Sequence, residues 1–258
     1  MRLSEMKVGI FDSGIGGLTV LKTCQSLLPE VQYLYYGDNL NAPYGGKSAD
    51  EIFGLTERAV KELGQAGAQA VVLACNTATA VCAERLRAEC AFPVIGMEPA
   101  VKPAVKECRR VLVLATPRTA ESERLQALVG REGKGEVTVY GAPRLAGAIE
   151  RALCFGERLT ISDHLPAGSY DGVVLGCTHY VYFGREIADF YGAKVFDGNF
   201  GTAKRLRNLL ELNEIGIGDH LRPRPELLEN LKNQVVFLGK SAEMNQKIYK
   251  ENNCFQNI

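Results

Sequence analysis

The sequence predicts an α/β protein made of two similar α/β domains with mainly parallel sheets and an active site in the cleft between them. Short β-branched runs alternate with helix-like segments along the 258 residues, which is typical of parallel sheets built from βα units. The runs form two sets offset by about 100 to 105 residues. In addition, VVLACNT (71–77) and VVLGCTH (173–179) repeat one pattern. A constant offset indicates two topologically similar halves, and convergent spacing of ordinary βα units is the alternative.

Each strand is expected where an apolar, β-branched run is bounded by turn residues or a helical pattern. The first set lies at 7–11, 31–36, 70–74 and 93–96, and the second at 110–115, 136–140, 172–176 and 193–197. A helix (200–213), a loop rich in glycine and proline (216–225), a strand (QVVFLG, 234–239) and an amphipathic helix follow. This tail has no counterpart in the middle of the sequence, so we expect it to pack on the first half.

The two halves are expected to meet near GMEPAVKPA (96–104), where two prolines interrupt the pattern. We therefore predict a discontinuous first domain with Asp12 and Cys75, and a second domain with Cys177 and His179. Their predicted bounds are 1–97 together with 209–258, and 98–208.

Composition excludes several classes of protein. Lys+Arg and Asp+Glu both number 30, and this balance argues against a nucleic-acid or membrane-surface protein, as does the absence of a basic run. The apolar runs are much shorter than the roughly 20 residues of a membrane span. The start, MRLSEMKVGIF, has no signal-peptide pattern, so we expect a cytoplasmic protein whose eight cysteines are reduced.

The segments that follow the predicted strands share one character. Ligands of open α/β sheets bind at the carboxyl ends of strands, where helix N-termini offer free N–H groups. These segments hold small hydrogen-bonding residues, two thiols, one carboxylate and one imidazole, and no metal-ligand spacing: FDSGIGG (11–17), APYGGKS (42–48), CNT (75–77), TPRT (116–119) and CTH (177–179). This composition predicts a site for an anionic small molecule without a metal.

Two glycine-rich segments resemble nucleotide motifs but miss a required glycine. GGKS (45–48) has asparagine at position 41, where the phosphate loop needs glycine, and GIGG (14–17) has threonine at position 19. We expect instead that Gly14, Gly16 and Gly17 let backbone amides approach a carboxylate.

Cys75 and Cys177 occupy duplicated contexts 102 residues apart. A thiol at a helix N-terminus has its thiolate stabilised by the helix dipole, so we expect a lowered pKa at both positions. Asn76, Thr77 and Thr178 are expected to cap the following helices and to bind a carboxylate.

Two thiols that face one substrate from opposite sides suit the inversion of a carbon centre. One thiolate removes a proton from one face, and the other thiol returns a proton to the opposite face. A disulfide-exchange enzyme usually places its cysteines in a C-x-x-C pattern, which this chain lacks.

The motifs together resemble the glutamate racemases of the aspartate/glutamate racemase family over nearly the whole chain. They are FDSGIGGLTVL (11–21), YYGDNLNAPYGGKS (35–48), ACNTATA (74–80), VLATPRTAES (113–122), LGCTHY (175–180) and the tail VVFLGKSAEMNQKIY (235–249). The resemblance implies a cofactor-independent enzyme of the cytoplasm that binds glutamate, forms a homodimer and supplies D-glutamate for bacterial peptidoglycan.

The resemblance also implies the roles of individual residues. Cys75 and Cys177 are the paired acid/base residues, assisted by Asp12 and His179 respectively, with Glu150 near the histidine. The substrate-binding residues implied are Asp12, Ser13, Tyr44, Gly45, Asn76, Thr77, Thr178 and His179, with Thr116 and Thr119 as further contacts.

Departures from the family pattern lie outside this chemistry. Val181 stands where the family usually has proline, and DGNFGTA (197–203) replaces a serine-bearing segment. A racemase for aspartate or a hydantoin, and a catalytically silent binding protein, are the alternative functions. The intact pair of cysteines argues against a silent protein.

Overall fold

The computed structural model describes residues 3–132, 135–213 and 235–251. The predicted loop at 216–225 lies outside these ranges. Within them, all nine predicted strands form, and their bounds agree with the prediction to within about one residue.

The first sheet contains five parallel strands in the order β4-β3-β1-β2-β9. Their bounds are β1 Lys7–Asp12, β2 Gln32–Gly37, β3 Ala70–Leu73, β4 Val94–Gly96 and β9 Val235–Leu238. Strand β9 pairs with β2, so the tail of the chain returns to the first half.

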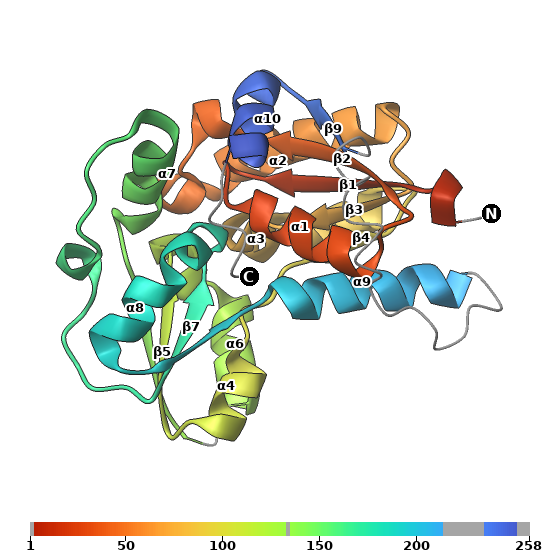
Figure 1. The fold of residues 1–258 in the computed structure, drawn as a ribbon. Coiled ribbons are helices and arrows are strands. Elements are labelled where there is room, and N and C mark those ends of the chain that lie inside the picture. Colours follow the sequence, from red (N-terminus) through yellow and green to blue (C-terminus); the bar gives the residue numbers. More distant parts are fainter. Residues whose placement is uncertain (1–2, 133–134, 214–234, 252–258) are drawn as a thin grey trace.

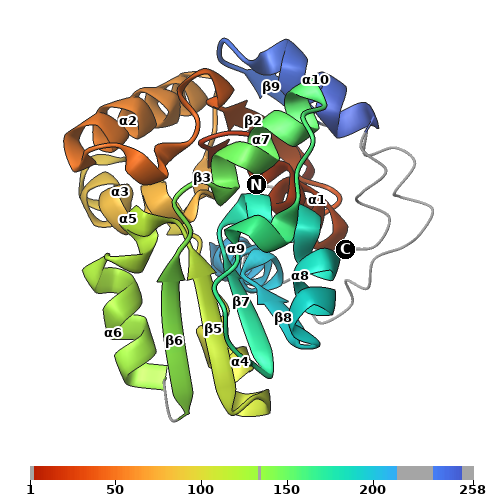
Figure 2. The same cartoon turned by 90° about the vertical axis from the view of Figure 1, so that its left-hand side faces the viewer.

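The second sheet contains four parallel strands in the order β6-β5-β7-β8, which Figure 2 shows side by side. Their bounds are β5 Arg110–Ala115, β6 Glu136–Gly141, β7 Gly172–Gly176 and β8 Lys194–Asp197. In both sheets the first strand of its set lies between the second and the third, and the fourth lies outside the third. The register repeats as well, because Val8 pairs with Ala70 as Val111 pairs with Gly172. The predicted repeat is therefore confirmed in the topology.

Helices cover both faces of each sheet (Figures 1 and 2). The main helices of the first half are α1 Gly17–Leu27, α2 Ala49–Gln65, α3 Asn76–Glu89, α9 Asn199–Asn213 and α10 Ala242–Glu251. Those of the second half are α4 Val101–Glu107, α5 Pro117–Ala120, α6 Glu123–Glu132, α7 Leu145–Phe155 and α8 Gly184–Tyr191. Short 3-10 helices are η1 Leu3–Glu5, η2 Asn39–Asn41, η3 Tyr44–Gly46, η4 Ile161–His164 and η5 Thr178–Phe183.

Alternate residues of each strand face opposite helical layers, as the period of a pleated strand requires. In β1, Val8 and Ile10 pack with α1 and α9, whereas Phe11 packs with α2 and α3. Burying a side chain of this size contributes about 1.5–3 kcal/mol, so these layers hold the strand ends, and the loops that follow them, in fixed positions.

Helix α9 belongs to the core of the first half. Its buried residues Ala203, Leu206 and Leu210 pack with α1 and β1. We therefore propose that the chain re-enters the first domain near residue 199, earlier than the predicted position 209. The two chain connections between the sheets touch each other there, because a side chain at Gly198 would collide with the Glu98 carbonyl and the Met97 sulfur.

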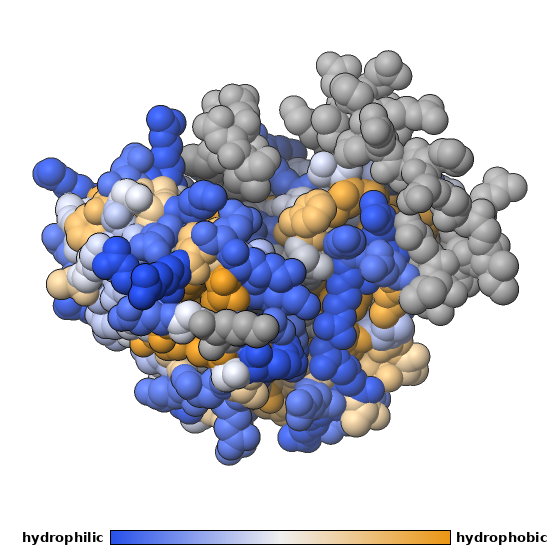
Figure 3. Space-filling view, turned by 90° about the horizontal axis from the view of Figure 1, so that it is seen from below, coloured by the Kyte–Doolittle hydropathy of each residue, from blue (hydrophilic) through white to orange (hydrophobic). Residues whose placement is uncertain are grey.

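The surface seen from below mixes hydrophilic side chains with smaller groups of hydrophobic ones (Figure 3). Among the described residues, no helix is both long and apolar enough to cross a membrane.

Candidate active site

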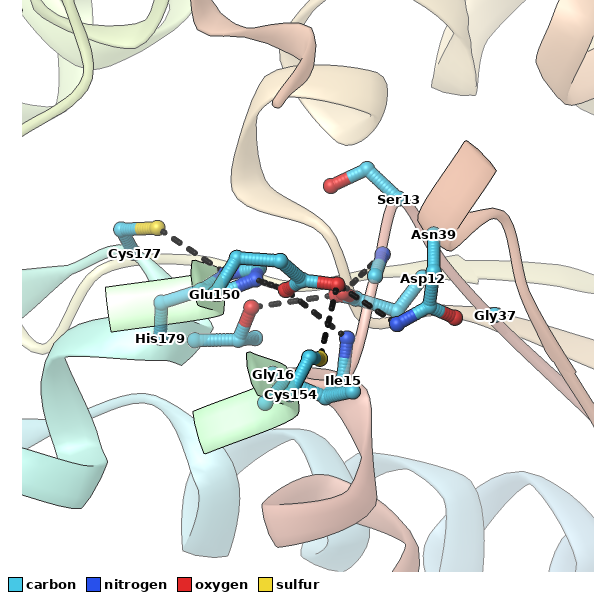
Figure 4. Close-up of polar contacts among 12 residues, drawn as sticks. Asp12, Ser13, Ile15, Gly16, Gly37, Asn39, Glu150, Cys154, Cys177 and His179 are labelled. Carbon is cyan, nitrogen blue, oxygen red and sulfur yellow. Dashed lines mark hydrogen bonds and ion pairs between the residues drawn. The ribbon is translucent and has the colours of Figure 1, made fainter. Parts of the chain in front are cut away.

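The predicted site residues come together where the two sheets face each other. The loops that follow β1 and β3 in the first half meet the loop that follows β7 and helix α7 of the second. Figure 4 shows the Glu150 carboxylate at the centre of the resulting polar network, with His179 and Cys177 on one side and Asn39 on the other.

Cys75 lies at the boundary between β3 and α3, and it is 5% exposed. Its sulfur caps α3 by accepting a hydrogen bond from the Ala78 N–H at 3.4 Å. The thiol donates to the Ser13 hydroxyl at 3.3 Å. The predicted capping by Asn76 or Thr77 is wrong, since the cysteine itself is the cap.

The expected lowering of the Cys75 pKa is also wrong. Burial raises the pKa of the Cys75 thiol to about 12, and the charge of Asp12 adds to this effect. Hydrogen bonds from Ser13 and the Ala78 N–H favour the thiolate but do not outweigh desolvation. The buried Cys75 side chain is therefore expected to be a thiol at neutral pH.

Cys177 occupies the corresponding place after β7, and it is 7% exposed. Here the chain enters the 3-10 helix η5, not an α-helix, so the predicted capping by Thr178 does not occur. The Cys177 sulfur lies 3.7 Å from Nδ1 of His179, and Nε2 of the same ring contacts Oε2 of Glu150. The structure thus brings together the three residues expected on this side.

His179 is buried against two acidic groups. Burial alone lowers the pKa of His179, but the Glu150 carboxylate and the Cys177 sulfur outweigh burial, so its pKa lies well above the ordinary value. The raised pKa favours a protonated ring, whose two nitrogens face Glu150 and Cys177.

Asp12 ends β1 and is completely buried. It accepts hydrogen bonds from the Gly14 N–H at 2.9 Å and from the Thr178 hydroxyl at 3.0 Å, so it joins the two halves. Burial raises the pKa of Asp12 to about 6, although the facing His179 and the bond from Gly14 lower it. Asp12 can therefore change its protonation state near neutral pH.

Glycines of the first loop allow the halves to approach. A side chain at Gly14 would lie 2.5 Å from the Glu150 carboxylate, and one at Gly16 would collide with Thr178. Backbone amides of this loop meet carboxylates of the protein: Gly14 N–H binds Asp12, and Ile15 N–H binds Glu150 at 3.2 Å. The expected approach of the loop amides to a bound carboxylate stays a prediction.

Three hydroxyl groups form a second bridge between the halves. Thr77 Oγ1 lies 2.9 Å from Thr116 Oγ1 and 3.2 Å from Thr119 Oγ1. Asn76 beside them is buried, and its Oδ1 has no hydrogen-bond partner among the described atoms. A buried acceptor without a partner costs free energy unless a ligand supplies the donor.

Tyr44 and Gly45 lie against this bridge. The Tyr44 hydroxyl donates to Asp38 at 2.8 Å, so the phenol is used within the first half. Gly45 is in contact with Thr116, where a side chain would be 2.8 Å from Cβ of the threonine. Gly45 therefore brings the backbone, and not a side chain, to the site.

Sequence reasoning missed Asn39 and the backbone amide of Ile15, both of which bind Glu150. Asn39 lies within the quoted segment YYGDNLNAPYGGKS, but nothing in its local pattern distinguishes it from a loop residue. Only the docking of α7 on the first half reveals the contact. No group of three or more metal-ligating side chains occurs in the part of the chain that the structure describes.

Comparisons with known proteins agree with the fold. A family model described as Asp/Glu/Hydantoin racemase matches residues 19–206. The glutamate racemase of Halothermothrix orenii is 44% identical over 218 residues, which cover 80% of this chain and 85% of that protein. A crystal structure of Escherichia coli glutamate racemase, in complex with L-glutamate and the activator UDP-MurNAc-ala, matches with a TM-score of 0.78 and 28% identity over 95% of this chain and 94% of that one. Glutamate racemase from Aquifex pyrophilus matches with a TM-score of 0.70 and 32% identity over 96% of each chain.

Proposed function

This chain belongs to the Asp/Glu/Hydantoin racemase family, and on that premise we propose that it interconverts L- and D-glutamate without a cofactor, using Cys75 and Cys177 as the two acid/base groups. The observation that carries the proposal is the position of the thiols. They follow equivalent strands of two sheets that repeat one topology, and the sheets face each other.

The two thiols divide the inversion between them. One cysteine, as thiolate, removes the α-proton from one face of the substrate, and the other, as thiol, donates a proton to the opposite face. The roles are exchanged for the other enantiomer. His179, held by Glu150, accepts or returns the proton of Cys177, while Asp12 is the ionisable group that influences Cys75 most.

The substrate's polar groups match the hydrogen-bonding groups of the site. The hydroxyls of Ser13, Thr77, Thr116 and Thr119 and the backbone at Gly45 offer donors to carboxylates, and the free Asn76 Oδ1 offers an acceptor to an ammonium group. Preorganised donors in a site that excludes water stabilise the negative charge that develops when the weakly acidic α-proton leaves.

Binding requires the halves to separate, because the residues of the site are buried in the structure. We therefore expect the free protein to open and the substrate to close it. Small-angle scattering with and without glutamate measures this change, and identical profiles would count against closure.

The wider role follows from the family resemblance. We propose that the enzyme works in the cytoplasm as a homodimer and that its product, D-glutamate, enters peptidoglycan synthesis.

The direct test is a racemization assay on purified protein. L-glutamate is incubated in D₂O without added cofactor, while circular dichroism follows inversion and NMR follows α-deuterium incorporation. Parallel reactions with L-aspartate and a hydantoin test the related substrates of the family. Inversion of glutamate with deuterium uptake is expected, and the proposal fails if neither occurs.

A further inference from the structure

Glu150 receives hydrogen bonds from both halves of the molecule. It lies on α7 of the second half, where Oε2 contacts His179. The first half supplies the Ile15 N–H to Oε2 at 3.2 Å and the Asn39 amide to Oε1 at 2.5 Å. The carboxylate that holds the histidine is therefore itself held from across the interface (Figure 4).

Asn39 is fixed in place by the first half alone. It begins the short helix η2, and the preceding residue, Asp38, is bound to the backbone of Asp12 at 3.0 Å. The Asp38 carboxylate accepts hydrogen bonds from Asn41 at 2.9 and 3.0 Å and from Tyr44 at 2.8 Å. This turn presents the Asn39 amide to α7 without relying on Glu150.

The orientation of the Asn39 amide follows from charge. Its NH₂ group must face the carboxylate, since its oxygen would be repelled by Oε1. A donor that binds a carboxylate favours the charged form and lowers the affinity of the carboxylate for a proton. The bond therefore makes it easier for the His179–Glu150 pair to release its proton.

We propose that Asn39 is a positioning residue that sets the proton affinity of the His179–Glu150 pair, and that it does so only when the two halves are closed. The inference rests on the proposed racemization and extends it. Because Asn39 is braced on one half and Glu150 on the other, opening breaks this bond and the bond from Ile15 together. The proton affinity of the pair beside Cys177 is thereby lowered when the halves close around the substrate.

Other ionisable groups also face Glu150 and influence the pair. They are Asp12 on β1, Tyr35 on β2, Cys154 one helical turn along α7 at 3.9 Å, and His179 with Cys177 behind it. All of them remain in a variant at position 39, so a change in the pH dependence reports the missing amide.

The test compares Asn39→Ala and Asn39→Asp with Leu40→Ala, which changes an exposed side chain of the same turn, as a matched control. Asn39→Ala removes the donor, and we expect kcat to fall about 10- to 100-fold, the scale of one hydrogen bond to a charged group. The limb of the kcat–pH profile that belongs to the pair should move to higher pH by about one unit, and further in Asn39→Asp, which adds a negative charge. Leu40→Ala should leave this limb in place.

Isotope effects locate the defect in one half-site. With α-deuterated glutamate, the primary isotope effect on kcat/KM should increase in Asn39→Ala for the enantiomer that Cys177 deprotonates and decrease for the other. Equal changes for both enantiomers, an unmoved pH limb in both Asn39 variants, or the same shifted profile in Leu40→Ala would overturn the inference.

The controls separate this inference from the proposed function. Wild-type protein that does not racemize glutamate defeats the proposed function itself. An active wild-type protein with folded Asn39 variants that keep its pH profile defeats only the role of Asn39. Thermal melting verifies folding, and the near-isosteric Asn39→Asp keeps the test valid if the alanine variant unfolds.

Discussion

The two half-sites share a backbone and differ in their side-chain partners. Cys75 and Cys177 each follow the third strand of their set, at matching positions in sheets of matching topology. Cys75 has the Ser13 hydroxyl as its neighbour, whereas Cys177 has an imidazole backed by a carboxylate. The repeated fold thus fixes where a sulfur lies, and the residues around it determine how its proton is handled.

The segments after the cysteines show the same contrast. NTATAVCAERLRAE forms the α-helix α3 directly after Cys75, while THYVYF after Cys177 forms the 3-10 helix η5. Aromatic and β-branched residues lose rotamer freedom in an α-helix, which disfavours an α-helix over THYVYF. In the tighter 3-10 helix, the ring of His179, two residues after Cys177, reaches the Cys177 sulfur.

Replacement of either cysteine is expected to have the largest effect. If each thiol serves one face of the substrate, Cys75→Ser and Cys177→Ser both lose the general acid/base contribution of about 10²–10⁴-fold in kcat. Circular dichroism of glutamate racemization measures the loss, and Cys90→Ser, a half-buried thiol of the first half, is the control that should stay active. Full activity in either of the first two variants would show that the half-sites do not share the reaction.

Removal of the neighbours should affect the two half-sites unequally. His179→Asn deletes the only base next to Cys177 in the described network, so we expect kcat to fall about 100-fold or more and the pH limb of the pair to disappear. Ser13→Ala deletes one hydrogen bond to Cys75, and a loss of about five- to tenfold is expected. Steady-state kinetics from pH 6 to 10 compares the losses of kcat in the two variants. Equal losses would contradict the predicted difference between the two half-sites.

Asp12 is expected to make folding stability depend on pH. Its folded-state pKa of about 6 is raised above the ordinary 3.8, so its favourable contribution is complete below about pH 3.8 and is lost as pH rises through 6. Asp12→Asn removes the buried charge and should stabilise the protein at pH 8 by about 1–3 kcal/mol relative to wild type.

The same variant should bring no comparable gain near pH 4, and its racemase activity should fall. Urea unfolding at the two pH values measures the difference. A constant difference between Asp12→Asn and wild type would show that Asp12 does not titrate as its burial indicates.

Local patterns were sufficient to predict the strands and the positions of both thiols. Runs such as RVLVLA (110–115) have high strand propensity. The nearly constant offset between the two sets of strands can also be read from the sequence alone. The roles of Glu150 and His179 came from the family resemblance, and their contact is present in the structure.

Two features that escaped prediction depend on docking between the halves. Thr178 was expected to cap a helix, but it binds Asp12 of the other half, and Asn39 reaches Glu150 across the same interface. The Cys75 pKa was misjudged for a different reason, since the N-terminus of the helix favours the thiolate while burial in the core of the first half opposes it. Sequence spacing within one half contains no information about these contacts.

The contact of Gly198 with Met97 and Glu98 limits the mechanics of the whole molecule. The chain passes between the sheets at these two places, and they lie against each other with no room for a side chain at residue 198. Because the two crossings touch, they form one pivot, at which the halves stay joined if they turn relative to each other. A bulky residue at this pivot would alter the angle between the sheets, and a rotation of a few degrees there would become a larger displacement at the sulfur atoms.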